Sequence, residues 1–101
     1  MVASMSLNIN NFKRMKFNTR GNENINIKIL SLLYKFGYKW TVTNNLKMLR
    51  NIREGKVRII YILTHEDGSI GYTDTPSTFN SAKFHKEIDL TDILRTDKNG
   101  N

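Results

Sequence analysis

The segment 23–36 has apolar residues on two faces of a predicted helix, and this feature constrains the fold most. One stripe, at helical spacing, consists of Ile25, Ile29, Leu32, Leu33 and Phe36. A second stripe, on roughly the opposite face, consists of Ile27, Leu30 and Tyr34. A helix that is apolar on two sides is usually buried on two sides. We therefore expect either that a sheet wraps around this helix or that the second stripe meets another protein chain.

The residues at the two ends of this segment also favour a helix. Asn22 is a good N-cap, because its side-chain oxygen can accept hydrogen bonds from the free amides of the first turn. Gly37 can adopt the left-handed conformation that ends many helices. The sequence therefore predicts a helix over residues 23–36.

A second, shorter helix is compatible with residues 44–54. Asn44 or Asn45 would cap it, and Glu54-Gly55 would end it. Met48, Leu49 and Ile52 would then face one way, and Lys47, Arg50 and Arg53 the other. A loop over the same residues is the alternative that the pattern leaves open.

Several segments have the composition of β-strands. Residues 57–64 are apolar on nearly both faces, which is typical of a central strand. Asp67-Gly68 predicts a turn after it, and residues 70–73 return as the hairpin partner. Further strands are predicted at 12–18, with Met15 and Phe17 facing inward, at 38–43 and near 87–90.

The rest of the C-terminal half has fewer signals. Residues 74–84 are expected to be irregular, with Phe79 and Phe84 as apolar anchors. Thr91 is expected to cap a final helical turn that holds Ile93 and Leu94.

These elements predict a single small α+β domain at residues 12–95. Its helices, one main and one short, would lie on one face of a mostly antiparallel sheet of about four strands. A chain of 101 residues fits one domain with a single modest core. Residues 1–11 are expected to form a flexible arm and residues 96–101 a disordered tail.

The chain has no Cys, which excludes disulfides and thiolate metal sites and suits an intracellular protein. No apolar run near the N-terminus is long enough for a signal peptide, and none approaches a membrane span. The sequence therefore predicts a soluble cytoplasmic protein without membrane contact.

Charge is distributed unevenly along the chain. The first 58 residues hold 12 of the 16 Lys and Arg, opposed by Glu23 and Glu54, for a net charge of +10. Residues 59–101 carry −3. The front of the chain should therefore attract polyanions or an acidic protein surface. Abundant Asn, Ile and Lys also indicate A/T-rich codons, which is an alternative origin for part of the charge.

The basic residues and interleaved aromatic residues favour single-stranded nucleic acid, since phosphates need cations and unpaired bases need flat stacking partners. RNA is preferred over duplex DNA, because a strand-like stretch separates the two predicted helices and no helix-turn-helix results. The residues predicted to bind RNA are Lys13, Arg14, Lys16, Arg20, Lys47, Arg50, Arg53 and Arg58 at phosphates and Tyr38 as the stacking residue.

A protein partner is the competing interpretation. The stripe of Ile27, Leu30 and Tyr34, flanked by Lys28 and Lys35, would form an apolar patch with a basic rim. Exposed apolar patches on small proteins often mark interfaces with other proteins or with further copies of the same chain. Cover by the sheet or by the N-terminal arm is the alternative of equal weight.

Catalysis is not expected. His65 and His85 with Lys83 would serve as acid, base and phosphate clamp for RNA cleavage only if the fold brought them together. Glu66, Asp67 and Asp74 lie around a Gly-containing turn, where acids are ordinary turn residues. Gly68-Ser69-Ile70-Gly71 lacks the Lys-Ser/Thr ending of a phosphate loop. We expect no catalytic residues, no metal and no cofactor.

Gly37, Tyr38, Lys39 and Trp40 form a corner at which the predicted helix leads into a strand. The hairpin at 59–72 and the closing strand at 87–90 follow it. This outline resembles small accessory proteins of T-even-type bacteriophages, whose genomes are also A/T-rich.

The resemblance implies an early phage product that adjusts host machinery or blocks a host defence in the cytoplasm of an infected bacterium. Because this chain is basic, it most resembles those phage accessory proteins that antagonise a host toxin ribonuclease with help from RNA. We therefore predict a non-enzymatic, RNA-binding protein that acts by forming a complex with a host factor. The alternative is a purely protein-directed inhibitor or adaptor that binds through the stripe of Ile27, Leu30 and Tyr34.

Overall fold

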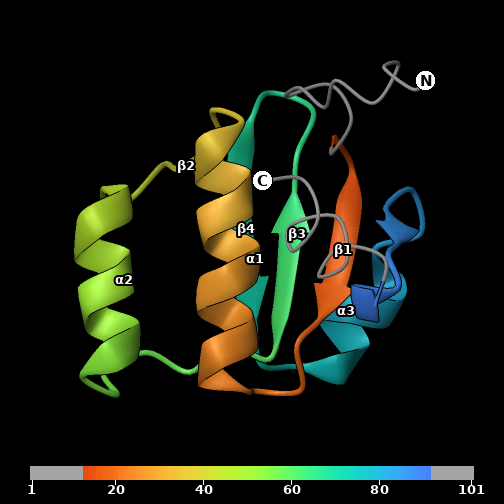
Figure 1. Ribbon diagram of the computed structural model, residues 1–101. Coiled ribbons are helices and arrows are strands. Elements are labelled where there is room, and N and C mark those ends of the chain that lie inside the picture. The colour runs from red at the N-terminus through yellow and green to blue at the C-terminus, as the bar shows by residue number, and fades with distance from the viewer. Residues whose placement is uncertain (1–12, 92–101) are drawn as a thin grey trace.

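The computed structural model describes residues 13–91 (Figure 1). The predicted arm at 1–11, the tail at 96–101, and Ile93 and Leu94 of the final turn lie outside the described residues. The elements in chain order are β1 (Met15–Asn18), α1 (Glu23–Lys35), β2 (Lys39–Trp40), α2 (Asn45–Arg53), β3 (Tyr61–Thr64), β4 (Ser69–Thr73), α3 (Pro76–Ser81) and β5 (Lys86–Glu87).

The strands form one sheet in the order β2-β4-β3-β1-β5. The β3–β4 hairpin and the β1–β3 pair are antiparallel, whereas the edge strands β2 and β5 run parallel to β4 and β1. The α+β class and the central position of β3 are confirmed. The sheet is mixed rather than mostly antiparallel, because the edge strands β2 and β5 join it by parallel pairing, which strand composition does not reveal. It has five strands rather than about four, since all of the predicted strand segments contribute to it.

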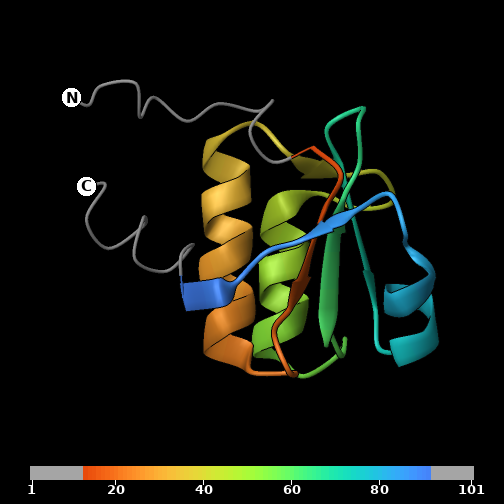
Figure 2. The same ribbon diagram turned by 90° about the vertical axis from the view of Figure 1, so that its right-hand side faces the viewer.

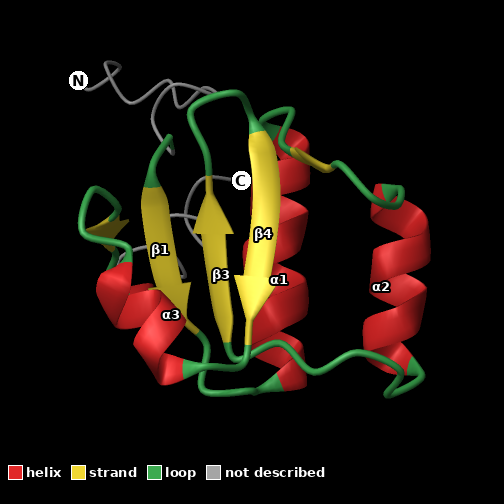
Figure 3. Cartoon of the chain, turned by 180° about the vertical axis from the view of Figure 1, so that it is seen from behind, coloured by secondary structure: helices red, strands yellow, loops and turns green. Residues whose placement is uncertain are grey.

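The sheet lies between two helical layers. Helices α1 and α2 lie side by side on one face, and α3 lies on the other (Figures 2 and 3). The prediction of an irregular stretch at 74–84 is therefore partly wrong. Pro76 begins α3, where its fixed φ suits the first helical turn, and Phe79 is buried as expected. Phe84 is 87% exposed, so its predicted role as a core anchor is wrong.

The ends of both main helices agree with the sequence. The Asn22 side chain accepts a hydrogen bond from the backbone N–H of Ile25 at 3.0 Å, and Gly37 follows α1 with φ of 93°. The Asn44 side chain caps α2 in the same way, accepting from Lys47 at 2.8 Å. Residues 44–54 are therefore a helix rather than a loop.

Two predicted strands are shorter than expected because side chains occupy their backbone groups. Asn45 accepts a hydrogen bond from the Trp40 backbone N–H and donates one to the Tyr38 carbonyl, so β2 ends at Trp40 and α2 begins soon afterwards. The buried Asn26 amide donates to the Ile59 carbonyl at 2.9 Å. This side-chain hydrogen bond takes the place of a strand–strand bond, and β3 begins only at Tyr61.

The second apolar face of α1 is covered within the chain itself. Leu30 is 0% exposed, and Ile27 and Tyr34 are partly buried against the same core. Helix α2 lies beside α1 (Figure 1) and contributes Met48 and Ile52 to that core. Helix α2 therefore contributes to this cover, where the sequence had suggested the sheet, the N-terminal arm or another protein chain.

This burial predicts a large difference between two Leu→Ala substitutions. Leu30→Ala should lower the free energy of unfolding by about 2–5 kcal/mol, because it leaves a cavity in the core. Leu46→Ala, at a helical position that is 76% exposed, should change it by less than about 0.5 kcal/mol. Urea unfolding of both variants checks the difference. Equal small effects would mean that Leu30 lies on the surface.

Candidate nucleic-acid interface

Helix α2 is amphipathic, with an exposed basic side. Met48 and Ile52 are buried toward the core, and Lys47, Arg50 and Arg53 are exposed. The three cations recur every three residues on the side opposite the core, which is the arrangement that the sequence predicted. Their position on a regular helix limits the backbone freedom that binding would otherwise have to restrict.

Helix α1 adds two exposed cations to the same layer. Lys28 and Lys35 are seven residues apart, so they lie on one side of α1 with exposed Ser31 between them. Helices α1 and α2 are neighbours (Figure 1), and together they carry five exposed cations. We call this surface the helical basic face; it consists of Lys28, Lys35, Lys47, Arg50 and Arg53.

The helical basic face has few acidic neighbours. Within residues 13–91, the ion pairs are Arg14–Glu66 and Lys56–Glu54, and neither uses a cation of this face. Glu23 lies in the first turn of α1, and Glu54 lies at the end of α2. Within residues 13–91, no carboxylate pairs with the charges of this face.

Two residues predicted to bind RNA are buried, so these predictions are wrong. Tyr38 is 0% exposed and offers no ring face to a base. Lys16 is 9% exposed; its Nζ donates to the Phe79 carbonyl at 2.8 Å and lies 4.5 Å from the Phe79 ring centroid. Lys16 alternates with the inward-facing Phe17, and α3 covers the side of the sheet that the sequence had left exposed.

The remaining predicted cations are scattered. Arg14 pairs with Glu66 near the β3–β4 turn, Lys13 is half-buried, and Arg58 is exposed in the loop before β3. Of the predicted phosphate-binding residues, the structure places Lys47, Arg50 and Arg53 together on one helix. Lys28 and Lys35, the other two cations of the helical basic face, were not among the predicted phosphate-binding residues, although their spacing of seven was a usable signal.

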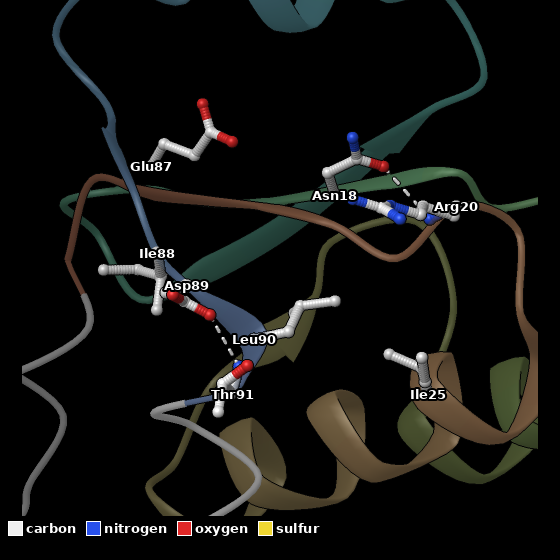
Figure 4. A pocket seen from close by; sticks show the side chains of 8 residues that line it. All are labelled: Asn18, Arg20, Ile25, Glu87, Ile88, Asp89, Leu90 and Thr91. Atoms are coloured by element: carbon white, nitrogen blue, oxygen red, sulfur yellow. Dashed lines mark hydrogen bonds between the residues drawn. The ribbon is translucent and has the colours of Figure 1, made fainter.

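Arg20 lies in a hollow of about 630 Å³ between β1, α1 and the segment after β5 (Figure 4). Glu87 and Asp89 also line it, and Asp89 accepts a hydrogen bond from the Thr91 backbone N–H at 2.8 Å. The Asn18 side chain accepts from the Arg20 backbone N–H at 3.0 Å. The two carboxylates in the lining would repel a phosphate, so we do not include this hollow in the interface.

The structure brings His65 and His85 together. Their rings are edge to face with centroids 5.5 Å apart, and a hollow of about 430 Å³ is lined by both, together with Arg14, Glu66 and Phe84. Lys83, the third residue of the catalytic hypothesis, is not in this lining. Twenty residues separate the two histidines in the sequence, and no local pattern predicts that they meet.

Residues 13–91 lack two kinds of feature. No three His, Asp or Glu side chains in this range come close enough to hold a metal ion. No helix in it has both the length and the apolar character needed to cross a bilayer.

Comparison with known proteins gives no match: no family model, curated protein or solved structure is significantly similar to this chain.

Tyr34, from the second stripe of α1, is an internal hydrogen-bond acceptor. Its hydroxyl accepts from the Trp40 indole Nε1–H at 2.7 Å, and the indole packs edge-on against Tyr72 with ring centroids 5.8 Å apart. Burial raises the pKa of the Tyr34 hydroxyl, and the hydrogen bond from Trp40 partly offsets this rise. Tyr34 therefore joins α1 to the edge strand β2.

Tyr34→Phe should lower the free energy of unfolding by about 1–3 kcal/mol, because it leaves the buried Trp40 N–H without an acceptor. Tyr72→Phe, at an exposed tyrosine against the same indole, should change it by less than about 0.5 kcal/mol. Urea unfolding followed by the fluorescence of Trp40, the one tryptophan in the chain, measures both variants. A neutral Tyr34→Phe would contradict a stabilising role for this hydrogen bond.

Proposed function

We propose that this protein binds RNA through its helical basic face and acts without catalysis. One observation carries the proposal: Lys47, Arg50 and Arg53 are exposed on one side of α2 and make no ion pair with any residue in 13–91. An unneutralised row of cations on a rigid element is what a phosphate backbone recognises.

Phosphate contacts should dominate the binding. The face has Lys28 and Lys35 as additional cations, and Tyr38, the stacking residue predicted from the sequence, is buried. Contacts to phosphates fix position on the nucleic acid but carry little sequence information. We therefore propose weak sequence preference and strong dependence on salt.

RNA is proposed over duplex DNA because β2 separates α1 from α2, and the two helices lie side by side on a sheet. A DNA-reading helix-turn-helix instead projects one helix into the major groove. RNA is commonly recognised by shape and by backbone contacts, which suit a broad cationic surface.

We further propose that the bound complex opposes a host factor such as a defence or toxin ribonuclease. A protein that covers the RNA backbone can restrict access of a nuclease without catalytic residues of its own. This part of the proposal rests on the outline shared with phage accessory proteins and on the charge of the chain.

A protein-directed inhibitor is the second candidate, and one observation favours it. Val42 and Leu46 are largely exposed just before and within α2, beside Lys47 of the helical basic face. An acidic protein with a small apolar patch would match this combination. Because Leu30 is buried, this surface replaces the stripe of Ile27, Leu30 and Tyr34 as the proposed contact.

Charge reversal on α2 tests the RNA proposal. Arg50→Glu with Arg53→Glu should weaken binding to a short single-stranded RNA. It should also lower the slope of log K against log salt by about 1.4, since each lost phosphate contact removes about 0.7. Fluorescence anisotropy across a salt series, with duplex DNA as a second ligand, measures both quantities.

The matched control is Lys83→Glu with Lys86→Glu, at exposed positions near β5 and far from α2 (Figure 1). Each double variant lowers the formal net charge from +7 to +3. A difference in RNA affinity between the two variants therefore reports where the charges lie and not how many there are. Equal losses in both variants would mean that attraction is nonspecific. Unchanged RNA affinity in the α2 variant would rule out the helical basic face.

A further inference from the structure

The hollow beside the β3–β4 turn is built from three segments that the sheet fixes together. Arg14 precedes β1, His65 and Glu66 follow β3, and Phe84 and His85 precede β5. The Lys86 backbone N–H donates to the Arg14 carbonyl at 2.8 Å, and the Met15 N–H donates to Thr64 Oγ1 at 2.9 Å. These bonds hold together the segments that line the hollow at the start of β1, a strand that lies at the opposite side of the molecule from α2 in Figure 3.

His85, which lines this hollow, has a buried polar atom without a partner. Its Nε2 is buried and has no hydrogen-bond partner among residues 13–91. Buried polar atoms in folded proteins nearly always have a partner, so an isolated one indicates a group that binds there. The ring of His65 lies against His85, with centroids 5.5 Å apart. Two imidazoles at this separation provide adjacent nitrogen donors when protonated.

Gly71 has no side chain and therefore leaves room for the His65 ring. A Cβ at this position would lie 3.1 Å from His65 Nε2. The turn below the ring is held by two backbone bonds, from His65 N–H to the Ser69 carbonyl at 3.0 Å and from Gly68 N–H to the His65 carbonyl at 3.1 Å. His65 is therefore placed by a rigid hairpin.

Arg14 contributes a cation from a strained backbone. Its φ of 56° lies in the left-handed region, which costs a non-glycine residue about 1–2 kcal/mol and is concentrated at functional sites. Its guanidinium pairs with Glu66, and both side chains are more than half exposed. An exposed pair of this kind stabilises the fold by about 0–1 kcal/mol, so a phosphate can replace the carboxylate at small cost.

Phe84 supplies an apolar surface at the rim. It lines the hollow and is exposed, although phenylalanine at such a position gains nothing from burial within the fold. An exposed ring next to cations is the combination that binds a nucleobase joined to a phosphate.

We propose that this hollow, formed by Arg14, His65, His85 and Phe84, binds a nucleotide phosphate with its base against Phe84. The nucleotide is either free or the end of an RNA strand. The site is separate from the helical basic face and does not depend on the function proposed for that face.

The charges around His85 determine how the affinity for an anion should change with pH. Arg14, Lys16 and His65 are its cationic neighbours; Glu66 lines the same hollow, and Asp67 interacts with His65. Burial, and then the charge of His65, lower the pKa of His85 below its ordinary value of 6.5. An anion would raise this pKa again, so binding takes up a proton. Affinity should increase as pH falls through the titration range below about 6.5.

Nuclear magnetic resonance of the full-length chain tests the proposal, because its two histidines give two assignable imidazole signals. Adenosine monophosphate, inorganic phosphate and adenosine would each be titrated at pH 5.5 and 7.5. We expect the monophosphate to shift both imidazole signals, to bind more tightly than either of the other two, and to bind about tenfold more tightly at pH 5.5. Equal binding of adenosine would overturn the proposal. So would unshifted imidazole signals at about 10 mM monophosphate, a concentration about tenfold above a weak Kd of about 1 mM.

Variants separate the parts of the site. His85→Gln should weaken monophosphate binding by at least about tenfold, the effect of one lost charge-assisted hydrogen bond. Phe84→Ala, at an exposed position that the fold does not need, should reduce monophosphate affinity to that of inorganic phosphate. Unchanged affinity in Phe84→Ala would contradict base stacking even if His85→Gln did not fold.

Two further measurements test where the monophosphate binds and whether a metal ion binds there instead. Arg50→Glu with Arg53→Glu should retain monophosphate binding at the histidines, which separates this result from the test of the helical basic face. Zn²⁺ is the competing ligand for paired imidazoles. Saturation of both histidine signals by micromolar Zn²⁺, with no response to the monophosphate, would overturn the proposal in favour of a metal site.

Discussion

The burial of α1 on both sides is the constraint on which the rest of the structure depends. Ile29, Leu30 and Leu33 are all wholly buried, so the sheet and α2 must both remain in place for α1 to exclude water. Burial of large aliphatic side chains is the main favourable term in folding, at about 1.5–3 kcal/mol each. Tyr34 and Asn26 add polar links from the same helix, to Trp40 and to the Ile59 carbonyl.

This arrangement also explains where the charges lie. Because α1 and α2 use their apolar sides for the core, their cations are left on the outer surface. Among residues 13–91, the acids of the second half lie at the β3–β4 turn, before α3 and in or just after β5, on other parts of the molecule. A chain that is polarised in sequence thus becomes polarised in space. This polarity would orient the helical basic face toward RNA. The hollow lined by His65 and His85 has a cation of its own, Arg14, which pairs with Glu66.

Much of the helical structure could be predicted from sequence because its determinants are local. Asn22 and Asn44 cap the helices where they were expected to, and Gly37 adopts the positive φ that ends α1. The hairpin turn at Asp67-Gly68 and the central place of β3 follow equally local rules. Strand lengths could not be predicted in this way. The side chains of Asn45 and Asn26 form hydrogen bonds with backbone groups that strand composition assigns to the sheet.

The sequence by itself determined α1, the central hairpin and the α+β class, since local patterns decide each of these. For residues 44–54 it predicted a basic side only on the condition that the segment is a helix, and it left a loop open. Only the tertiary structure decided that Leu30 is buried in a core shared with α2, that α3 covers Lys16, that Tyr38 is buried and that His65 meets His85. Each of these depends on contacts between segments far apart in the chain. Side-chain periodicity shows which residues of an element share a face, but the packing of whole elements determines what that face meets.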